Sequence, residues 1–173
     1  MAKLANKVAL ITGAGSGIGR ESALRMAEEG AAVMCADRDF SGAETTAGII
    51  QNKGGAADAL ELDVSVESQV KASLNITVAQ LGGLDVIFNN AGVGGAGIGW
   101  DQTIAVNLSG VYYGLFHGAP FLAAQGGGVI INTASVAGLV GLTGPTVTDE
   151  LDEGVGAYVA AKHGVAGLTK QYA

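Results

Sequence analysis

The sequence has little cysteine and little charge, and both shortages limit what the protein can be. Cys35 is the single cysteine among 173 residues, so no disulfide can form within the chain, and we expect a reducing compartment, the cytoplasm. The 16 acidic residues outnumber the 9 Lys and Arg, which leaves a formal net charge of −7. Because an acidic surface repels a phosphate backbone, we exclude nucleic acid as a partner.

The sequence also lacks the patterns of a membrane span, a signal peptide and a metal site. Residues 102–148 contain no Asp, Glu, Lys or Arg, but Asn107, Gln125, Asn132 and several glycines interrupt this run before it reaches the ~20 apolar residues of a membrane helix. The N-terminus has no long apolar core of a signal peptide. We therefore expect no membrane partner. Asp149, Glu150, Asp152 and Glu153 have no cysteine or histidine beside them, so we expect a solvated acidic loop over 143–155 and no metal.

Glycine and apolar runs are abundant, and together they predict the fold. The 29 glycines cluster at turns between apolar segments, well above the usual ~7% of residues. Strand-like runs at 7–12, 32–36, 56–62, 84–88 and 129–132 alternate with helical patterns at 20–29, 41–52, 66–81, within 100–124, and at 156–172. The strands are uniformly apolar, which indicates that both faces of the sheet are covered. We predict one Rossmann-type domain, residues 1–173, with a doubly wound parallel sheet in three α/β/α layers.

A glycine-rich loop follows the first predicted strand, in the run Gly13-Ala14-Gly15-Ser16-Gly17-Ile18-Gly19. Gly13 permits the sharp turn out of the strand, Gly17 lets backbone approach a pyrophosphate, and Gly19 lets the following helix pack closely. The free N–H groups at the start of that helix would face the phosphates. Because a strand precedes the loop and a helix follows it, the motif predicts dinucleotide binding more strongly than its glycines alone.

Asp37 ends the second predicted strand, 18 residues after Gly19. An acidic side chain at that place can accept hydrogen bonds from the adenosine ribose, and it would repel the 2′-phosphate of NADP. An ordinary polar residue closing a strand is the alternative explanation. Arg38 could serve a 2′-phosphate, but Asp37 would remain in its way. We therefore predict NAD as the cofactor and rank NADP lower.

These motifs resemble those of the short-chain dehydrogenase/reductase family over nearly the entire chain. Besides Thr12-Gly13-x-x-x-Gly17-Ile18-Gly19, the similar motifs are Asp63-Val64, Asn89-Asn90-Ala91-Gly92, Asn107 in Val106-Asn107-Leu108, Ser135 in Asn132-Thr133-Ala134-Ser135, and Tyr158-Val159-Ala160-Ala161-Lys162. The resemblance implies that Asp63, Val64, Asn90, Ala91 and Gly92 line the adenosine side. It also implies a catalytic group of Asn107, Ser135, Tyr158 and Lys162, in which Tyr158 and Lys162 also bind the cofactor.

The chemistry of this group can be argued from its residue types. Tyr158 and Lys162 are four residues apart, so they share one helix face. A phenol ionises only near pH ~10 by itself, and a neighbouring ammonium favours its ionised form. Tyr158 can then exchange a proton with an alcohol or ketone while Ser135 holds the substrate oxygen. The resemblance implies that Asn107 anchors a water of a proton relay.

Each of these residues also has a structural alternative. Ser135 could only cap a turn, and Asn107 could be a buried helix polar group with its hydrogen bonds satisfied. Tyr158 could be an interface aromatic. Thr133 is a rival hydroxyl, because it points the same way along a strand as Ser135, two residues later.

The sequence departs from the family in three places. It ends at Ala173, just after the Lys162 helix, so we expect the last strands of the usual fold and its substrate-covering segment to be lacking. Ser135 and Tyr158 are 23 residues apart, farther than usual, and the stretch from Asn90 to Asn107 is shorter. We expect an NAD-dependent oxidoreductase of secondary alcohols or ketones. The alternative is a catalytically silent NAD-binding module or a truncated fragment of such an enzyme.

The partners expected are a small-molecule alcohol or ketone and a second copy of the chain. The segment 102–124 has no charge on any face, so it is not an ordinary surface helix. We expect this segment and the last helix to bury a face in a homodimer or homotetramer. The sequence does not reveal which alcohol or ketone is the substrate.

Overall fold

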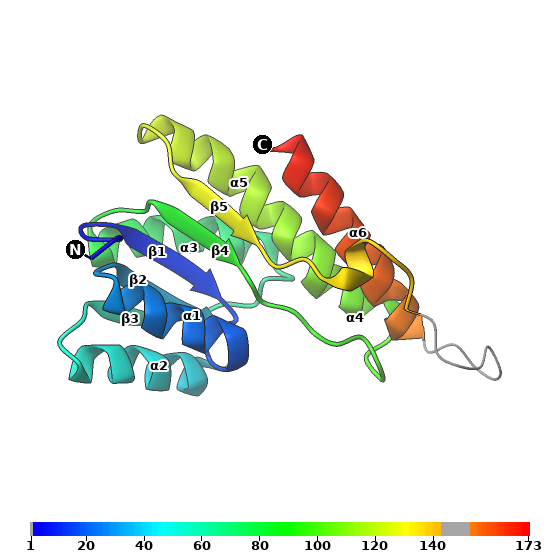
Figure 1. The fold of residues 1–173 in the computed structure, drawn as a ribbon, viewed down its shortest axis with the longest axis horizontal. Helices are drawn as coiled ribbons and strands as arrows, with labels where there is room; N and C mark the ends of the chain where they lie inside the picture. The colour runs from blue at the N-terminus through cyan, green and yellow to red at the C-terminus, as the bar shows by residue number, and fades with distance from the viewer. Residues whose placement is uncertain (1, 143–152) are drawn as a thin grey trace.

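In the computed structural model, which describes residues 2–142 and 153–173, five parallel strands form one sheet in the order β3-β2-β1-β4-β5 (Figure 1). The strands are β1 (Val8–Thr12), β2 (Ala32–Asp37), β3 (Ala57–Glu61), β4 (Val86–Asn89) and β5 (Val129–Asn132). The chain moves from β1 through β2 to β3 on one side and returns to the other side of β1 as β4. This order confirms the predicted doubly wound Rossmann-type fold.

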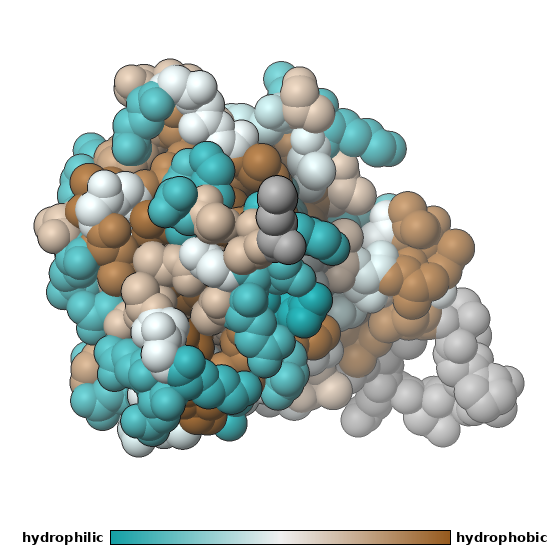
Figure 2. Space-filling model, turned by 60° about the vertical axis from the view of Figure 1, so that its left-hand side comes forward, coloured by the Kyte–Doolittle hydropathy of each residue, from teal (hydrophilic) through white to brown (hydrophobic). Residues whose placement is uncertain are grey.

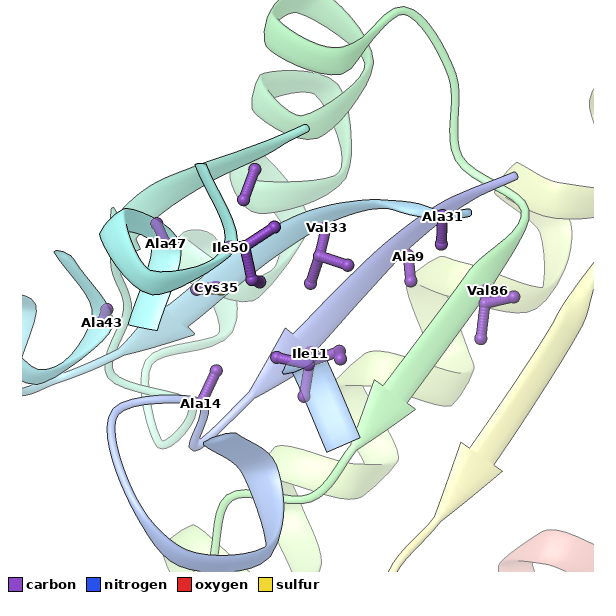
Figure 3. Packing of buried hydrophobic residues seen from close by; sticks show 12 residues of the cluster. Ala9, Ile11, Ala14, Ala31, Val33, Cys35, Ala43, Ala47, Ile50 and Val86 are labelled. Carbon is purple, nitrogen blue, oxygen red and sulfur yellow. The ribbon is translucent and has the colours of Figure 1, made fainter. Parts of the chain in front are cut away.

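The helices lie on both faces of the sheet. They are α1 (Gly17–Glu28), α2 (Phe40–Asn52), α3 (Glu67–Leu81), α4 (Trp100–Ile104), α5 (Gly110–Ala124) and α6 (Glu153–Gln171). Consecutive residues of a strand face opposite helical layers. In β1, Ile11 packs with α1 and α2 (Figure 3), whereas its neighbour Leu10 packs with α3 and α5. A third, smaller cluster joins α5 to α6 through Val111, Leu115 and Val165.

The expectation that both faces of every strand are covered is wrong for β5. Val129 and Ile131 are 56% and 38% exposed, whereas Ile130, between them, packs toward α5. The reason is that α1 and α2 lie over the half of the sheet that holds β1, β2 and β3 (Figure 1). The edge strand therefore keeps one apolar face open, although its sequence is as apolar as that of a buried strand.

The long helix expected within residues 100–124 is interrupted. A π-helical turn, Ala105–Ser109, lies between α4 and α5 and carries Asn107. The amide of Asn107 accepts a hydrogen bond from Val93 N and donates one to Val93 O, both at 2.8 Å. Such π turns are typical of places where a helix adjusts to hold one side chain, here against the loop that follows β4.

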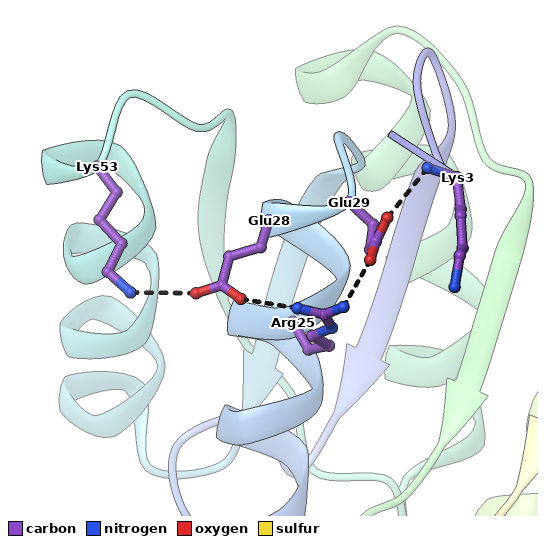
Figure 4. A network of polar contacts seen from close by, with 5 residues as sticks. All are labelled: Lys3, Arg25, Glu28, Glu29 and Lys53. Atoms are coloured by element: carbon purple, nitrogen blue, oxygen red, sulfur yellow. Dashed lines mark hydrogen bonds and ion pairs between the residues drawn. The ribbon is translucent and has the colours of Figure 1, made fainter. Parts of the chain in front are cut away.

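Polar contacts at the start of the strands tie the N-terminus, α1 and α2 together (Figure 4). Arg25 pairs with Glu28 at 3.3 Å and with Glu29 at 2.6 Å, and Lys53 reaches Glu28 at 3.3 Å. Arg25, Glu28 and Lys53 are exposed to solvent, so each pair contributes about 0–1 kcal/mol. A hollow of about 710 Å³ lies beside them, at the opposite end of the sheet from the glycine loop.

Two further predictions bear on the fold. None of the helices in the described ranges is long and apolar enough to cross a membrane. Cys35 is fully buried in β2, and its burial, with Asp58 nearby, raises the pKa of its thiol to about 12. The thiol is therefore part of the core and unreactive. The predicted acidic loop lies outside the described residues except for its end, since Glu153 begins α6.

Candidate cofactor and catalytic site

A hollow of about 420 Å³ lies at the ends of the parallel strands, between β1 and β4. This is the reversal point of the sheet, where strands stop being added on the β2 side of β1 and start being added on the β4 side. In open α/β sheets this reversal point is where ligands bind. The hollow brings together all the residues expected to bind the cofactor: Gly13, Ser16, Gly17, Ile18, Gly19, Asp37, Asp63, Val64, Asn90, Ala91, Gly92, Tyr158 and Lys162. Arg38 and Thr133 line it as well.

The glycines of the first loop each have a structural reason. Gly13 has φ +69°, and a Cβ there would lie 2.8 Å from the Cα of Ala91. Gly17 has φ +51° with no atom within 4 Å of a built Cβ, so its surroundings are open to a ligand. A Cβ on Gly19 would overlap the carbonyl oxygen of Gly13. Ser16 makes no side-chain cap, which leaves the first N–H groups of α1 free for an anion.

Asp37 holds the glycine loop as well as facing the hollow. One carboxylate oxygen accepts a hydrogen bond from Gly15 N at 2.8 Å, and the other accepts one from Asp39 N at 3.0 Å. Arg20 binds the other side of the loop, through Nη2 to Gly15 O and through Nε to Thr46 Oγ1 at 3.0 Å. The sequence interpretation missed Arg20, whose only signal was its place in the first turn of the helix.

Thr12 and Asn90 join the ends of β1 and β4. Thr12 Oγ1 accepts hydrogen bonds from Asn90 N and Ala91 N, both at 3.0 Å, and donates one to Phe88 O at 3.4 Å. The Asn90 side chain donates to Thr12 O at 3.0 Å. Side chains thus fix the loops on the two sides of the reversal point relative to each other, which shapes the hollow before any ligand binds.

Asp63 lies across the hollow from the glycine loop, beside Arg38. Hydrogen bonds from the hydroxyl and the backbone N–H of Ser65 lower the pKa of the Asp63 carboxyl, and the nearby Arg38 charge lowers it further. Asp63 is therefore ionised at neutral pH. Arg38 lies near enough to Asp63 for its charge to act on this carboxylate, but the two form no ion pair within the described residues.

Tyr158 and Lys162 come from α6 and lie on one face of it, as their spacing predicted. Lys162 Nζ is 5.6 Å from the centroid of the Tyr158 ring and donates a hydrogen bond to Thr133 O at 2.6 Å. Lys162 is 4% exposed, and burial lowers the pKa of its ammonium. Within residues 2–142 and 153–173, no carboxylate forms an ion pair with it. The ammonium of Lys162 therefore faces the hollow with donors that are still unused.

The two candidate hydroxyls are placed differently from the expectation. Ser135 is not among the residues that line the hollow, and its Oγ accepts a hydrogen bond from Ala137 N at 3.2 Å, capping a short 3-10 turn, Val136–Gly138. Thr133 lines the hollow, but its hydroxyl donates to Asn90 Oδ1 at 3.3 Å. The O–H of Ser135 makes no hydrogen bond among the described residues, so the hydroxyl can still act as a donor.

Asn107 is fully buried, and both ends of its amide bind the backbone of Val93. This matches the structural alternative of a satisfied polar group in a helix. Its role in a water relay stays a prediction, as do the catalytic roles of Ser135, Tyr158 and Lys162.

The parallel sheet, the glycine turn into α1 and the hollow at the reversal point define a Rossmann-type α/β protein. A model of the family described as short chain dehydrogenase matches residues 7–173, and the chain belongs to that family. It is 41% identical to cyclohexanol dehydrogenase of Acinetobacter sp. (strain SE19), over 97% of this chain and 66% of that protein.

Solved structures agree with this assignment. A crystal structure of levodione reductase superposes with a TM-score of 0.85 and 34% identity, over 98% of this chain and 66% of that one. A structure of NAD+-bound xylitol dehydrogenase gives 0.86 and 31%, over 98% and 64%. The chain thus spans slightly less than two thirds of the length of these relatives.

Proposed function

We propose that the protein binds NAD(H) in the hollow beside the glycine loop and transfers a hydride between NAD(H) and a secondary alcohol or ketone. The observation that carries the proposal is that Tyr158 and Lys162 open into the same hollow as the glycine loop and Asp37. A phosphate-binding helix start and a proton-exchanging phenol therefore share one space. The relatives support it, because cyclohexanol dehydrogenase, levodione reductase and xylitol dehydrogenase are all named for alcohol or ketone chemistry.

Bound NAD supplies the hydride acceptor in alcohol oxidation and, when reduced, the hydride donor in ketone reduction. The protein's own residues manage the proton. Tyr158 takes the proton of the alcohol oxygen, or returns one to the ketone oxygen, through its phenolic oxygen. Lys162 places its ammonium 5.6 Å from the centroid of that ring and has donors left for the nicotinamide ribose. The O–H of Ser135 would hold the substrate oxygen.

The position of Asp37 supports NAD rather than NADP as the cofactor. Its carboxylate is fixed by Gly15 N and Asp39 N and still has lone pairs for ribose hydroxyls. A 2′-phosphate at that place would meet this negative charge. Arg38, the residue that would favour NADP, lies close enough to Asp63 to lower the pKa of that carboxyl.

A catalytically silent NAD-binding module is the second candidate. One observation favours it: the Ser135 oxygen caps a turn, and Ser135 is not among the residues that line the hollow. In that case the hollow would bind NADH without turnover.

The test starts with fluorescence titrations of the 173-residue chain with NADH and NADPH. We expect NADH to bind at least ~10-fold more tightly. NAD reduction at 340 nm with a panel of secondary alcohols then separates the two candidates. Tyr158→Phe should keep NADH affinity and lose turnover, whereas Tyr172→Phe, a matched change at an exposed tyrosine, should alter neither. NADH binding without turnover on any alcohol would leave the silent module.

We also propose that the chain forms a homodimer or homotetramer. On α5, Tyr112 and Phe116 are 38% and 47% exposed and stack at a centroid distance of 5.5 Å. Exposed aromatic pairs on an uncharged helix are typical of interfaces. Elution as a monomer at micromolar concentration would contradict this proposal. The single buried thiol, Cys35, is the ground on which we propose the reducing cytoplasm as the compartment.

A further inference from the structure

Two segments outside the cofactor motifs lie against α6 beside Tyr158 and Lys162. On one side, a Cβ on Gly95 would overlap the carbonyl oxygen of Gly154 and lie 3.1 Å from the Cβ of Tyr158. On the other side, a Cβ on Gly138 would overlap the carbonyl oxygen of Lys162. The loop 93–99 and the segment 136–142 therefore flank the two residues proposed to do the chemistry, and glycine allows both close approaches.

These flanking segments contain no polar side chain at all. Residues 93–99 read VGGAGIG and residues 136–142 read VAGLVGL. Their large side chains point outward: Ile98, Val136, Leu139, Val140 and Leu142 are 41%, 64%, 76%, 54% and 48% exposed. Figure 2 shows apolar surface gathered at one end of the molecule. Exposed aliphatic side chains in this number are typical of a binding surface, and this one adjoins the hollow through Val93 and Gly94, which line it.

The polar groups beside Tyr158 have few hydrogen bonds left to offer. The side chain of Asn107 is engaged by Val93, that of Asn90 by Thr12 and Thr133, and the hydroxyl of Thr133 by Asn90. Among the described residues of this region, the side-chain groups with unused capacity are the hydroxyls of Tyr158 and Ser135, the remaining donors of Lys162, and the hydroxyl of Thr103, which is fully buried and so out of reach of a ligand. The donors of Lys162 are left for the cofactor, so the two hydroxyls remain to bind the substrate oxygen that gains or loses a proton.

We propose that the substrate is an uncharged alcohol or ketone with a single polar oxygen and an apolar body, which the side chains at 98, 136, 139, 140 and 142 cover. This inference rests on the proposed function and names its substrate class. A polyol would have to leave hydroxyls without hydrogen bonds against aliphatic side chains. Burying an unpaired hydroxyl costs more binding free energy than losing an apolar contact. An anionic substrate would find no cation in either segment, and Lys162 is committed to Thr133 and the cofactor.

The experiment compares three probes that share one six-membered carbon ring: cyclohexanol, 4-hydroxycyclohexanecarboxylate and myo-inositol. Each is given with NAD to the 173-residue chain, and kcat/KM is measured at 340 nm. We expect cyclohexanol to exceed both of the others by ~100-fold or more. Equal or better turnover of inositol or the carboxylate overturns the substrate class while leaving the proposed function intact.

Ligand-observed NMR on the NAD-loaded chain tests the same class without turnover. Saturation transfer to cyclohexanol but not to the other two probes supports the proposed substrate class, even if the chain turns over no alcohol. Transfer to inositol or the carboxylate as strong as that to cyclohexanol, or transfer to none of the three, overturns it.

A pair of variants locates the surface. Leu139→Gln keeps the size of an exposed side chain and should lower kcat/KM, or the NMR signal, for cyclohexanol about five-fold, as partial loss of apolar burial implies. Val129→Gln makes the same kind of change at an exposed residue, at the start of β5, and should stay within about two-fold of wild type. An equal response of the two variants means that another occupant covers the patch, and the proposal is then wrong.

Discussion

Two helical glycines allow a matched test of how closely α5 packs on the sheet. Gly48 in α2 has no atom within 4 Å of a built Cβ, so Gly48→Ala should gain the full helix propensity of alanine, about 1 kcal/mol. Gly114 in α5 has the same gain available. A Cβ there, however, would fall on the side-chain amide of Asn89, which is 5% exposed.

The cost at Gly114 can be worked out from that contact. The amide of Asn89 donates a hydrogen bond to Asn132 Oδ1 at 2.9 Å, and it must move to admit a methyl group. Losing a buried hydrogen bond costs ~1–3 kcal/mol, and overpacking adds ~1–3 kcal/mol. After the propensity gain, Gly114→Ala should destabilise the fold by at least ~1 kcal/mol.

Thermal unfolding followed by circular dichroism separates the two variants. A change of 1 kcal/mol moves the Tm of a domain of this size by ~2–4 °C. Gly48→Ala should therefore melt a few degrees above wild type and Gly114→Ala several degrees below it. A Gly114→Ala protein that melts at as high a temperature as Gly48→Ala would refute the reasoning. The space between α5 and Asn89 would then be large enough for a methyl group.

Three further predictions concern ionisable groups of the site. Asp37→Asn keeps an acceptor for Gly15 N but removes the charge, so NADH affinity should fall ~10-fold while NADPH affinity rises, as paired titrations would show. Lys162→Met removes an ammonium whose pKa is lowered below 10.5 by burial. Since the unfolded chain then holds the proton more tightly, wild type should gain stability relative to the variant as pH rises toward 10.5 in urea titrations, and a flat difference would contradict this. Asp63→Asn removes a carboxylate whose pKa Ser65 lowers. Wild type should exceed the variant in stability above pH ~3.8 and lose that advantage in acid, which melting curves from pH 2 to 6 would reveal.

The sheet and the cofactor side could be predicted because backbone requirements fix residue types there. Gly13 and Gly17 have positive φ, and Gly19 contacts the carbonyl oxygen of Gly13, so the spacing of the glycines carries the geometry. The apolar runs placed all five strands within a residue or two. The exposed face of β5 could not be predicted, because the sequence VIIN is the same whether or not a helix covers it.

The substrate side was harder to predict because its geometry depends on hydrogen bonds between residues far apart in the sequence. The turn that begins at Ser135 decides where its hydroxyl points, and the partner of Thr133 is Asn90, 43 residues earlier. A strand pattern assigns both hydroxyls to one face and cannot rank them. Arg20 escaped notice for the same reason, since its contacts with Gly15 and Thr46 exist only once α1 and α2 are packed.

The cofactor side and the substrate side are built from different kinds of residue. Mutations should therefore weaken cofactor binding and substrate binding independently. The cofactor side is built from glycine backbone and from two sets of hydrogen bonds: Asp37 accepts one from Gly15 N, and Thr12 and Asn90 bind each other. The proposed substrate side is built from exposed aliphatic residues, which contribute little to folding because they bury little apolar surface. Changes at Leu139 or Val140 should therefore alter which ring or chain is accepted without disturbing the nucleotide site, because neither residue lines the hollow.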